Sequence, residues 1–150
     1  MPIDVVTCLL MEKLRDNLNL TPSFKRAAKG WSAKIIVKIL PEKDIPYIYK
    51  TYLEIKDGKC IDLRALEPEE EVDADIIIEM GISTYVALLS GKTSSTQAFL
   101  TRKIKARGKV RELLLHKAVL DELNKLMNRL LFGGEAIEVL LPLLKREFFF

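Results

Sequence analysis

Gly91-Lys92-Thr93 is the stretch of this sequence that most resembles a catalytic motif. A phosphate-binding loop ends in these residue types, because backbone N–H groups and a lysine hold the phosphates. That motif also needs a glycine five residues before Gly91, where this chain has Val86, and a strand in front, where the pattern predicts a helix. Gly91 is better explained as the end of that helix, since glycine readily adopts the left-handed conformation found there. We therefore expect no nucleotide site.

The other reactive side chains form no catalytic or metal-binding set. His116 is the only histidine, and no cysteine lies near it in the sequence. A metal site or a nucleophile–base pair needs several such groups together. Ser90, Ser94 and Ser95 suit the ends of helices better than catalysis. The sequence predicts a protein that is not an enzyme and that has no metal or other cofactor.

An acidic run at 67–75 raises the question of a calcium site. Calcium loops place their ligands at alternating positions around a glycine turn, and this run contains no glycine. We expect instead a solvated loop that crosses from one part of a sheet to another.

Composition narrows the class of protein. The chain has 49% hydrophobic and 30% charged residues, so its apolar and polar faces should be strongly separated. The net charge of +3 is small, and Lys and Arg are interleaved with acids along the sequence; we therefore expect no nucleic acid partner. Its length favours a single domain, 1–150, with N-terminal helices at 1–30, a sheet with crossover helices at 31–108, and C-terminal helices at 109–150.

No feature of the sequence predicts export or a membrane span. Asp4 interrupts the apolar residues 3–11, and no positive segment precedes them as in a signal peptide. The apolar stretch 136–144 is shorter than the roughly 20 residues of a spanning helix. Cys8 and Cys60 are too few for a disulfide framework, and their apolar surroundings favour buried, reduced thiols. We expect a soluble, cytoplasmic protein.

Periodicity predicts helices first and strands next. Apolar residues recur at helical spacing in 3–18, and Thr21-Pro22 fits the start of a short helix that ends at Gly30, with Phe24 pointing inward. Alternation then predicts three strands, at 33–39, 47–56 and 59–65.

Asp57-Gly58 is a strong signal for the turn that joins the second strand to the third. On the third strand we expect one face to carry Cys60, Asp62 and Arg64 and the other Ile61, Leu63 and Ala65. The sheet should have one wet face and one dry face, and helices should cover the dry one.

Strands and helices alternate between Asp73 and Gly108. The predicted elements are a buried strand at 76–78, a helix from Ile82 to Gly91, a short helix with Ser94 and Gln97 as its capping box, and a basic strand at 103–107.

The longest helical pattern runs from Val110 to Phe132, or roughly 35 Å. Its apolar residues cover more than one stripe, and we expect His116 at its exposed edge. A further helix should begin at 136–141, after Gly133-Gly134.

This order of elements resembles the sterol carrier protein (type two) family of lipid-binding domains. The resemblance covers about 31–125 and is carried by Ala74-Asp75, Leu88-Leu89-Ser90-Gly91-Lys92, Ala98-Phe99 and Lys103–Gly108. It implies an α/β (α+β) fold, in which a five-stranded mixed sheet in the order 3-2-1-4-5 has helices packed on one face. The sequence departs from the family where Thr101-Arg102 replaces a usual glycine before the basic strand.

The resemblance also implies a hydrophobic tunnel between sheet and helices, which binds fatty acyl chains, acyl-CoAs or sterols without chemistry. Each methylene of a lipid tail gains about 0.8 kcal/mol on leaving water, so such a site needs few polar groups. The residues proposed to line it are Tyr85, Leu88, Leu89, Phe99, Ile104, Leu113, Leu114, Leu130 and Leu131. Alternatively, all of them fill the core.

Two functions remain open on this basis. The first is a carrier of lipids or acyl-CoA that contacts membrane surfaces transiently. The second is an interaction module with a filled core, which forms a homodimer or docks a lipid-metabolising enzyme through the apolar face of the long helix. In a lipid carrier, the segment Phe148-Phe149-Phe150 would close the mouth of the tunnel as a lid or insert into a membrane surface. The alternative is that it packs against the N-terminal helix.

Overall fold

The computed structural model describes residues 5–42 and 48–132, with the backbone alone at 5–7 and 130–132. The predicted helix at 136–141 and the Phe148–Phe150 end lie outside these residues. The elements in chain order are α1 (Val5–Leu20), α2 (Pro22–Ala28), β1 (Ala33–Leu40), β2 (Tyr49–Lys56), β3 (Lys59–Leu66), β4 (Ile76–Gly81), α3 (Ile82–Leu89), α4 (Ser95–Leu100), β5 (Ile104–Gly108), α5 (Val110–Leu115) and α6 (Lys117–Phe132).

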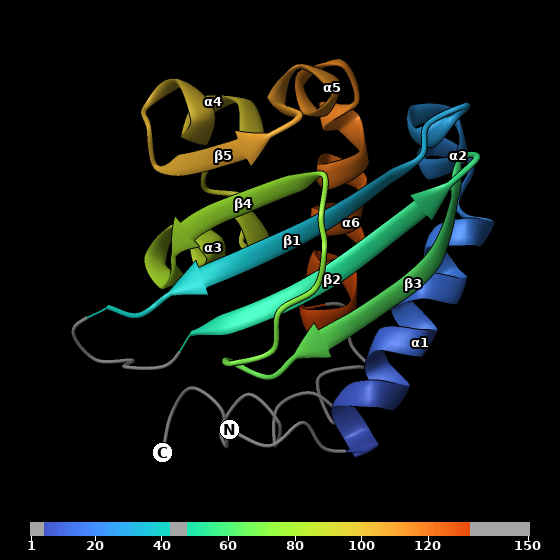
Figure 1. Cartoon of the computed structure of the whole chain (residues 1–150), viewed down its shortest axis with the longest axis horizontal. Coiled ribbons are helices and arrows are strands. Elements are labelled where there is room, and N and C mark those ends of the chain that lie inside the picture. The colour runs from blue at the N-terminus through green and yellow to red at the C-terminus, as the bar shows by residue number, and fades with distance from the viewer. Residues whose placement is uncertain (1–4, 43–47, 133–150) are drawn as a thin grey trace.

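The strands form one five-stranded sheet in the order β3-β2-β1-β4-β5. The central strand β1 pairs in parallel with β4 and antiparallel with β2, and the β2–β3 and β4–β5 pairs are antiparallel. Parallel neighbours need a crossover connection, and here the chain crosses the sheet between β3 and β4 (Figure 1). The predicted fold class and strand order are confirmed.

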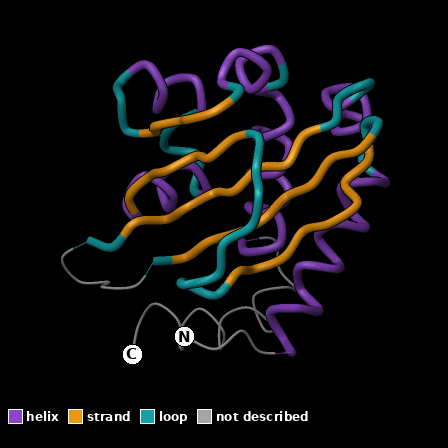
Figure 2. Tube along the Cα trace, in the orientation of Figure 1, coloured by secondary structure: helices purple, strands orange, loops and turns teal. Residues whose placement is uncertain are grey.

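Helices α1, α3 and α6 lie behind the sheet, on one of its faces (Figure 1). α1 packs against β3, while α6 contacts α1, α2, α3 and α4. The tube in Figure 2 shows that the other face is crossed by a loop. None of the helices among the described residues combines the length and apolar composition that a bilayer crossing requires.

The core between the layers consists mainly of apolar side chains. Phe24, Ile35, Ile76, Leu113 and Val119 are completely buried, and the inward position predicted for Phe24 is confirmed. Burying side chains of this size stabilises the fold by about 1.5–3 kcal/mol each. These five come from α2, β1, β4, α5 and α6, so one cluster holds the sheet and its helices together.

The β2–β3 hairpin turns at Asp57-Gly58 as predicted, and both residues have positive φ. The faces predicted for β3 are wrong at its start. A β-bulge shifts the register, so that Cys60 rather than Ile61 lies opposite Ile55. Cys60 is therefore buried on the helix-covered face and Ile61 is 44% exposed. The side-chain amide of Asn19 explains the bulge, because it donates to the Cys60 carbonyl and accepts from the Cys60 N–H, both at 2.8 Å.

The long helix predicted from Val110 to Phe132 is in fact two helices, α5 and α6, which meet at His116. His116 leaves the helical conformation, with φ −118° and ψ 26°. Its ring stacks on Trp31, with centroids 4.4 Å apart and planes 4° from parallel. His116 is thus half-buried rather than at an exposed edge. The break lets Leu113 and Val119, which would lie about 120° apart around one straight helix, both reach the core.

We call the face of the sheet that the helices do not cover the open face. It is less exposed to solvent than predicted, because the crossover loop packs on it. Val72 and Ala74 of that loop contact a small cluster of Ile36, Tyr52 and Leu66. This loop was predicted to be solvated, and its apolar side chains are instead half-buried.

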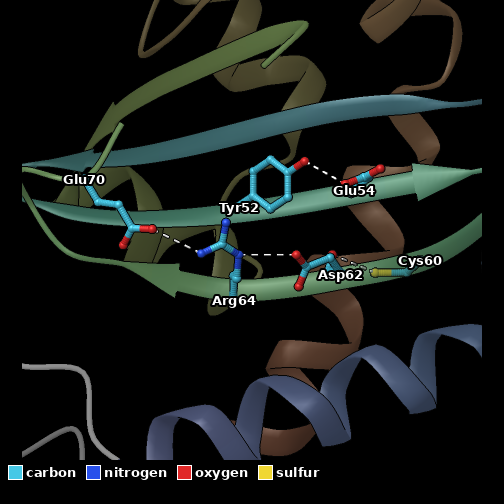
Figure 3. Close-up of polar contacts among 6 residues, drawn as sticks. All are labelled: Tyr52, Glu54, Cys60, Asp62, Arg64 and Glu70. Atoms are coloured by element: carbon cyan, nitrogen blue, oxygen red, sulfur yellow. Dashed lines mark hydrogen bonds and ion pairs between the residues drawn. The ribbon is translucent and has the colours of Figure 1, made fainter. Parts of the chain in front are cut away.

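Polar contacts fasten the same loop to the strands (Figure 3). The Arg64 guanidinium lies 3.2 Å from the Glu70 carboxylate, 3.3 Å from that of Asp62 and over the Tyr52 ring. The Tyr52 hydroxyl donates to Glu54 at 2.8 Å. Burial, and then this hydrogen bond, raise the pKa of Tyr52 well above its usual range. These contacts hold the crossover loop on the face of the sheet that the helices do not cover. The polar network on this face therefore has a structural role.

The turn into β5 shows the consequence of the missing family glycine. Arg102 adopts φ +61°, a conformation that costs a non-glycine residue about 1–2 kcal/mol. The topology is preserved nonetheless, because β5 pairs with β4 in register from Ile104 to Gly108.

We predict that Gly108→Ala lowers the free energy of unfolding by about 3 kcal/mol or more. Gly108 has φ +92°, and a Cβ there would clash with the backbone oxygen of Asp75. Gly91→Ala is the matched control, since Gly91 has φ +78° but no atom within 4 Å; it should cost about 1 kcal/mol. Equal losses in urea denaturation would contradict the close approach of Asp75.

We predict that a thiol reagent modifies one cysteine in the folded protein at pH 8 and both in denaturant. Cys8 is exposed, whereas Cys60 is buried, and burial raises the pKa of Cys60 to about 12. The pKa of Cys60 in the folded protein lies above the ordinary 9.0. The protonated Cys60 thiol therefore contributes to the free energy of unfolding below pH 9, and this contribution is lost as pH rises toward 12. In Cys60→Ala, the free energy of unfolding should fall less between pH 9 and 12. Two reactive thiols in the folded state would disprove the burial.

Candidate functional site

The helix-covered face of the sheet is not sealed everywhere. Residues of β1 and β2 that lie opposite one another share this face, and Ile35 and Leu53 are fully buried there. The next pair toward the other end of the strands, Val37 and Thr51, is only half-buried. Part of the apolar surface at Val37 and Thr51 is thus exposed to solvent, although the next inward residue of β1, Ile39, is buried.

Two further half-buried residues extend this surface. Ala65 of β3 lies opposite Thr51, and Tyr49 of β2 lies opposite Ile39. We call Val37, Tyr49, Thr51 and Ala65 the floor. The floor could not be predicted from the sequence, because alternation shows which residues face inward but not how completely helices cover them.

The helices contribute half-buried apolar residues that pack against the same core. They are Met11 of α1, Tyr85 of α3, Phe99 of α4, and Leu123 and Met127 of α6. Methionine is flexible and fills irregular space well. Such side chains can adapt to guests of different shape.

The structure brings together most of the residues proposed to line a tunnel. Leu88, Ile104 and Leu113 are buried in the main core, with Tyr85 and Phe99 packed against it. Leu89 is also buried, and its carbonyl accepts a hydrogen bond from Asn128, which ties α3 to α6.

Three proposed residues lie elsewhere or are not placed. Leu114 is 53% exposed, so it points away from the core that Leu113 fills. Leu130 and Leu131 belong to the last turn of α6, and their side chains are outside the described residues.

Tyr85 brings a hydroxyl from the helical layer to this largely apolar region. Its hydroxyl forms no hydrogen bond with any residue that the structure describes, and burial raises the pKa of Tyr85 to about 12. A ligand oxygen or a water molecule near it would accept a hydrogen bond from this hydroxyl.

The motifs that suggested chemistry have structural roles. Gly91 ends α3 with φ +78°. The N–H groups of Lys92 and Thr93 donate to the Ala87 carbonyl at 2.9 and 3.3 Å, so neither points at a phosphate. The Ser94 hydroxyl caps α4 by accepting from the Gln97 N–H at 3.1 Å. Nowhere in residues 5–42 and 48–132 do three or more His, Cys, Asp or Glu side chains gather as a metal would require.

Comparison with solved structures finds the same fold. A crystal structure of sterol carrier protein 2 is 21% identical, with TM-score 0.70, over 83% of this chain and 98% of that one. A conserved hypothetical protein from Thermus thermophilus is 20% identical, with TM-score 0.71, over 90% and 95%. Sterol carrier protein 2 from Yarrowia lipolytica, in its apo form, is 22% identical, with TM-score 0.51, over 85% and 96%.

Comparison by sequence with curated proteins finds no match. Residues 12–121, however, match the SCP-2 sterol transfer family. Since this match spans well over half of the chain, the protein belongs to the SCP-2 sterol transfer family.

Proposed function

We propose that this protein binds and transfers hydrophobic ligands without catalysing a reaction. Fatty acids, fatty acyl-CoAs and sterol-like lipids are the classes that suit an apolar site of this kind. The observation that carries the proposal is the floor, an apolar part of the sheet that the helices leave half-buried in a protein of this family.

The physical basis is the transfer of a lipid tail from water to an apolar surface. Ten methylenes contribute about 8 kcal/mol before the costs of association. Specific polar contacts are then unnecessary, and ligand choice depends on the length and girth of the tail. A single polar group such as the Tyr85 hydroxyl would orient the ligand rather than hold it.

We place the ligand between the floor and the helices that face it. Tyr85, Leu88, Leu89, Phe99, Ile104 and Leu113 would form the walls, with Leu130 and Leu131 toward one end. Leu114 would contact a ligand only at an entrance, because it faces outward. Cytoplasm is the compartment that we propose, since Cys8 and Cys60 are free thiols of the kind a reducing environment preserves.

The alternative is a docking module that forms a homodimer or binds an enzyme. It is favoured by Leu114 and Leu115 of α5, which are 53% and 74% exposed. In that case the floor would have no guest, and its half-burial would have no role.

A fluorescent fatty acid should bind to the purified protein with one saturable site at micromolar concentration or below. The free energy of burying the tail predicts this range. Native mass spectrometry of the same sample should show a copurified lipid. A homodimer that takes up no probe and carries no lipid would favour the docking module.

Val37→Phe should lower affinity for the probe at least tenfold and leave the free energy of unfolding within about 1 kcal/mol, because the added ring would occupy the ligand's space. Ile35→Phe is the matched control: Ile35 is the neighbouring inward residue of β1 and is fully buried. Overpacking there should cost about 1–3 kcal/mol. If Val37→Phe is as destabilising as Ile35→Phe, the space above the floor is filled.

A further inference from the structure

Positive charge is concentrated in one segment of this chain. Residues 92–117 contain eight of the 24 Lys and Arg residues and one of the 21 Asp and Glu residues, a net charge of +7. The whole chain has a net charge of +3, so the remainder is acidic. A weakly charged protein therefore carries one strongly basic region.

The fold places this segment along one edge of the sheet. β5 is the edge strand next to β4. Three residues join it to α4 and one residue joins it to α5, so α4, β5 and α5 follow one another along the edge at the top of Figure 1.

Most of these cations are free to meet an anion. Arg107 pairs with Glu79 and Lys109 with Asp75. Six others are exposed and make no ion pair with any residue that the structure describes: Lys92, Arg102, Lys103, Lys105, Arg111 and Lys117.

Three leucines stand among these cations and face solvent. Leu100 at the end of α4 is 79% exposed, and Leu114 and Leu115 at the end of α5 are 53% and 74% exposed. We call these leucines and the six free cations the basic edge. Exposed apolar side chains interspersed with Lys and Arg are the composition of surfaces that lie on anionic bilayers.

Arg102 adds a second observation. It holds a left-handed backbone conformation that glycine would adopt without strain. Here it places a cation two residues from Leu100 in the turn between α4 and β5. The fold alone would be served better by glycine, so the charge is what this position supplies.

We propose that the basic edge docks the protein on a membrane surface rich in anionic lipids. The inference rests on the proposed lipid-binding function, for which it supplies the delivery face. α4, β5 and α5 each carry a proposed wall residue on their inner side, namely Phe99, Ile104 and Leu113. Docking through their outer side places the bilayer next to the ligand site.

A membrane fits this surface better than a nucleic acid does. Proteins that bind single-stranded nucleic acid stack bases on aromatic side chains, and the aromatic residue of α4, Phe99, packs inward instead. Leucines that insert among acyl chains leave water, whereas a phosphate backbone offers them no apolar contact.

The test is cosedimentation of the full chain with vesicles of phosphatidylcholine containing 30% phosphatidylserine. Binding should be strong, should be absent with phosphatidylcholine alone, and should weaken on raising NaCl from 0.1 to 0.5 M. The variant Arg102→Gly, Lys103→Gln, Lys105→Gln should bind about 100-fold more weakly, since each cation contributes about fivefold. Leu100→Gln with Leu115→Gln should weaken binding at least tenfold.

The matched control is Lys29→Gln, Lys56→Gln, Lys59→Gln. It removes the same charge from exposed lysines at the β2–β3 turn and should change vesicle binding less than threefold. Equal losses in the two triple variants would overturn the proposal, because net charge rather than the basic edge would then drive binding. Tighter binding to a single-stranded RNA than to vesicles, or a homodimer that buries the leucines, would also overturn it.

Uptake of a fluorescent fatty acid without vesicles separates this inference from the proposed function. Unchanged uptake in the Arg102, Lys103, Lys105 variant, together with lost vesicle binding, supports both. If the protein takes up the fatty acid but binds no anionic vesicles, the membrane-docking role of the basic edge is overturned and the proposed function stands. If the protein binds vesicles but takes up no fatty acid, the docking role is supported and its part in lipid delivery is removed.

Discussion

The apolar face of a five-stranded sheet must be kept from water, and this requirement governs the whole structure. The helices seal one half of that face completely, from Phe24 and Trp31 to Leu113 and Val119. Around Val37 and Thr51 the cover is thinner and the floor remains half-buried, whereas Ile39 beyond Val37 is buried again. A sheet that offers more apolar surface than its helices cover can gain stability by binding an apolar guest.

Rigid and adaptable parts are separated in this arrangement. The sheet is fixed by the Asn19 contact at the bulge, the Arg64 network on the open face and the close approach of Gly108 to Asp75. The helices contribute long, flexible or aromatic side chains such as Met11, Tyr85 and Met127, which pack half-buried against the core. A fixed sheet beneath side chains of this kind suits ligands that differ in girth.

Local signals were enough to predict most of the elements and their order along the chain. Asp57-Gly58 predicted the hairpin, Ser94 the cap of α4 and Gly91 the end of α3, because each is decided by residues close in sequence. The bulge at Cys60 was not predictable, since it depends on Asn19, 41 residues away. The break at His116 depends in the same way on Trp31.

The candidate site was predicted less completely than the fold. Spacing identified wall residues such as Leu88 and Leu113, but half-burial of Val37 and Thr51 depends on helices elsewhere in the chain. Interleaving of charges along the whole sequence also hid the basic segment 92–117, which becomes a surface only when β5 forms an edge.

The central claim is that a lipid tail binds over the floor. Nuclear magnetic resonance of the methyl-labelled protein mixed with a fatty acid tests this claim most directly. We expect intermolecular contacts between the acyl chain and the methyl groups of Val37, Thr51, Ala65 and Leu88. An acyl chain that contacts none of them, or that contacts only the open face near Ile36 and Leu66, would contradict this account.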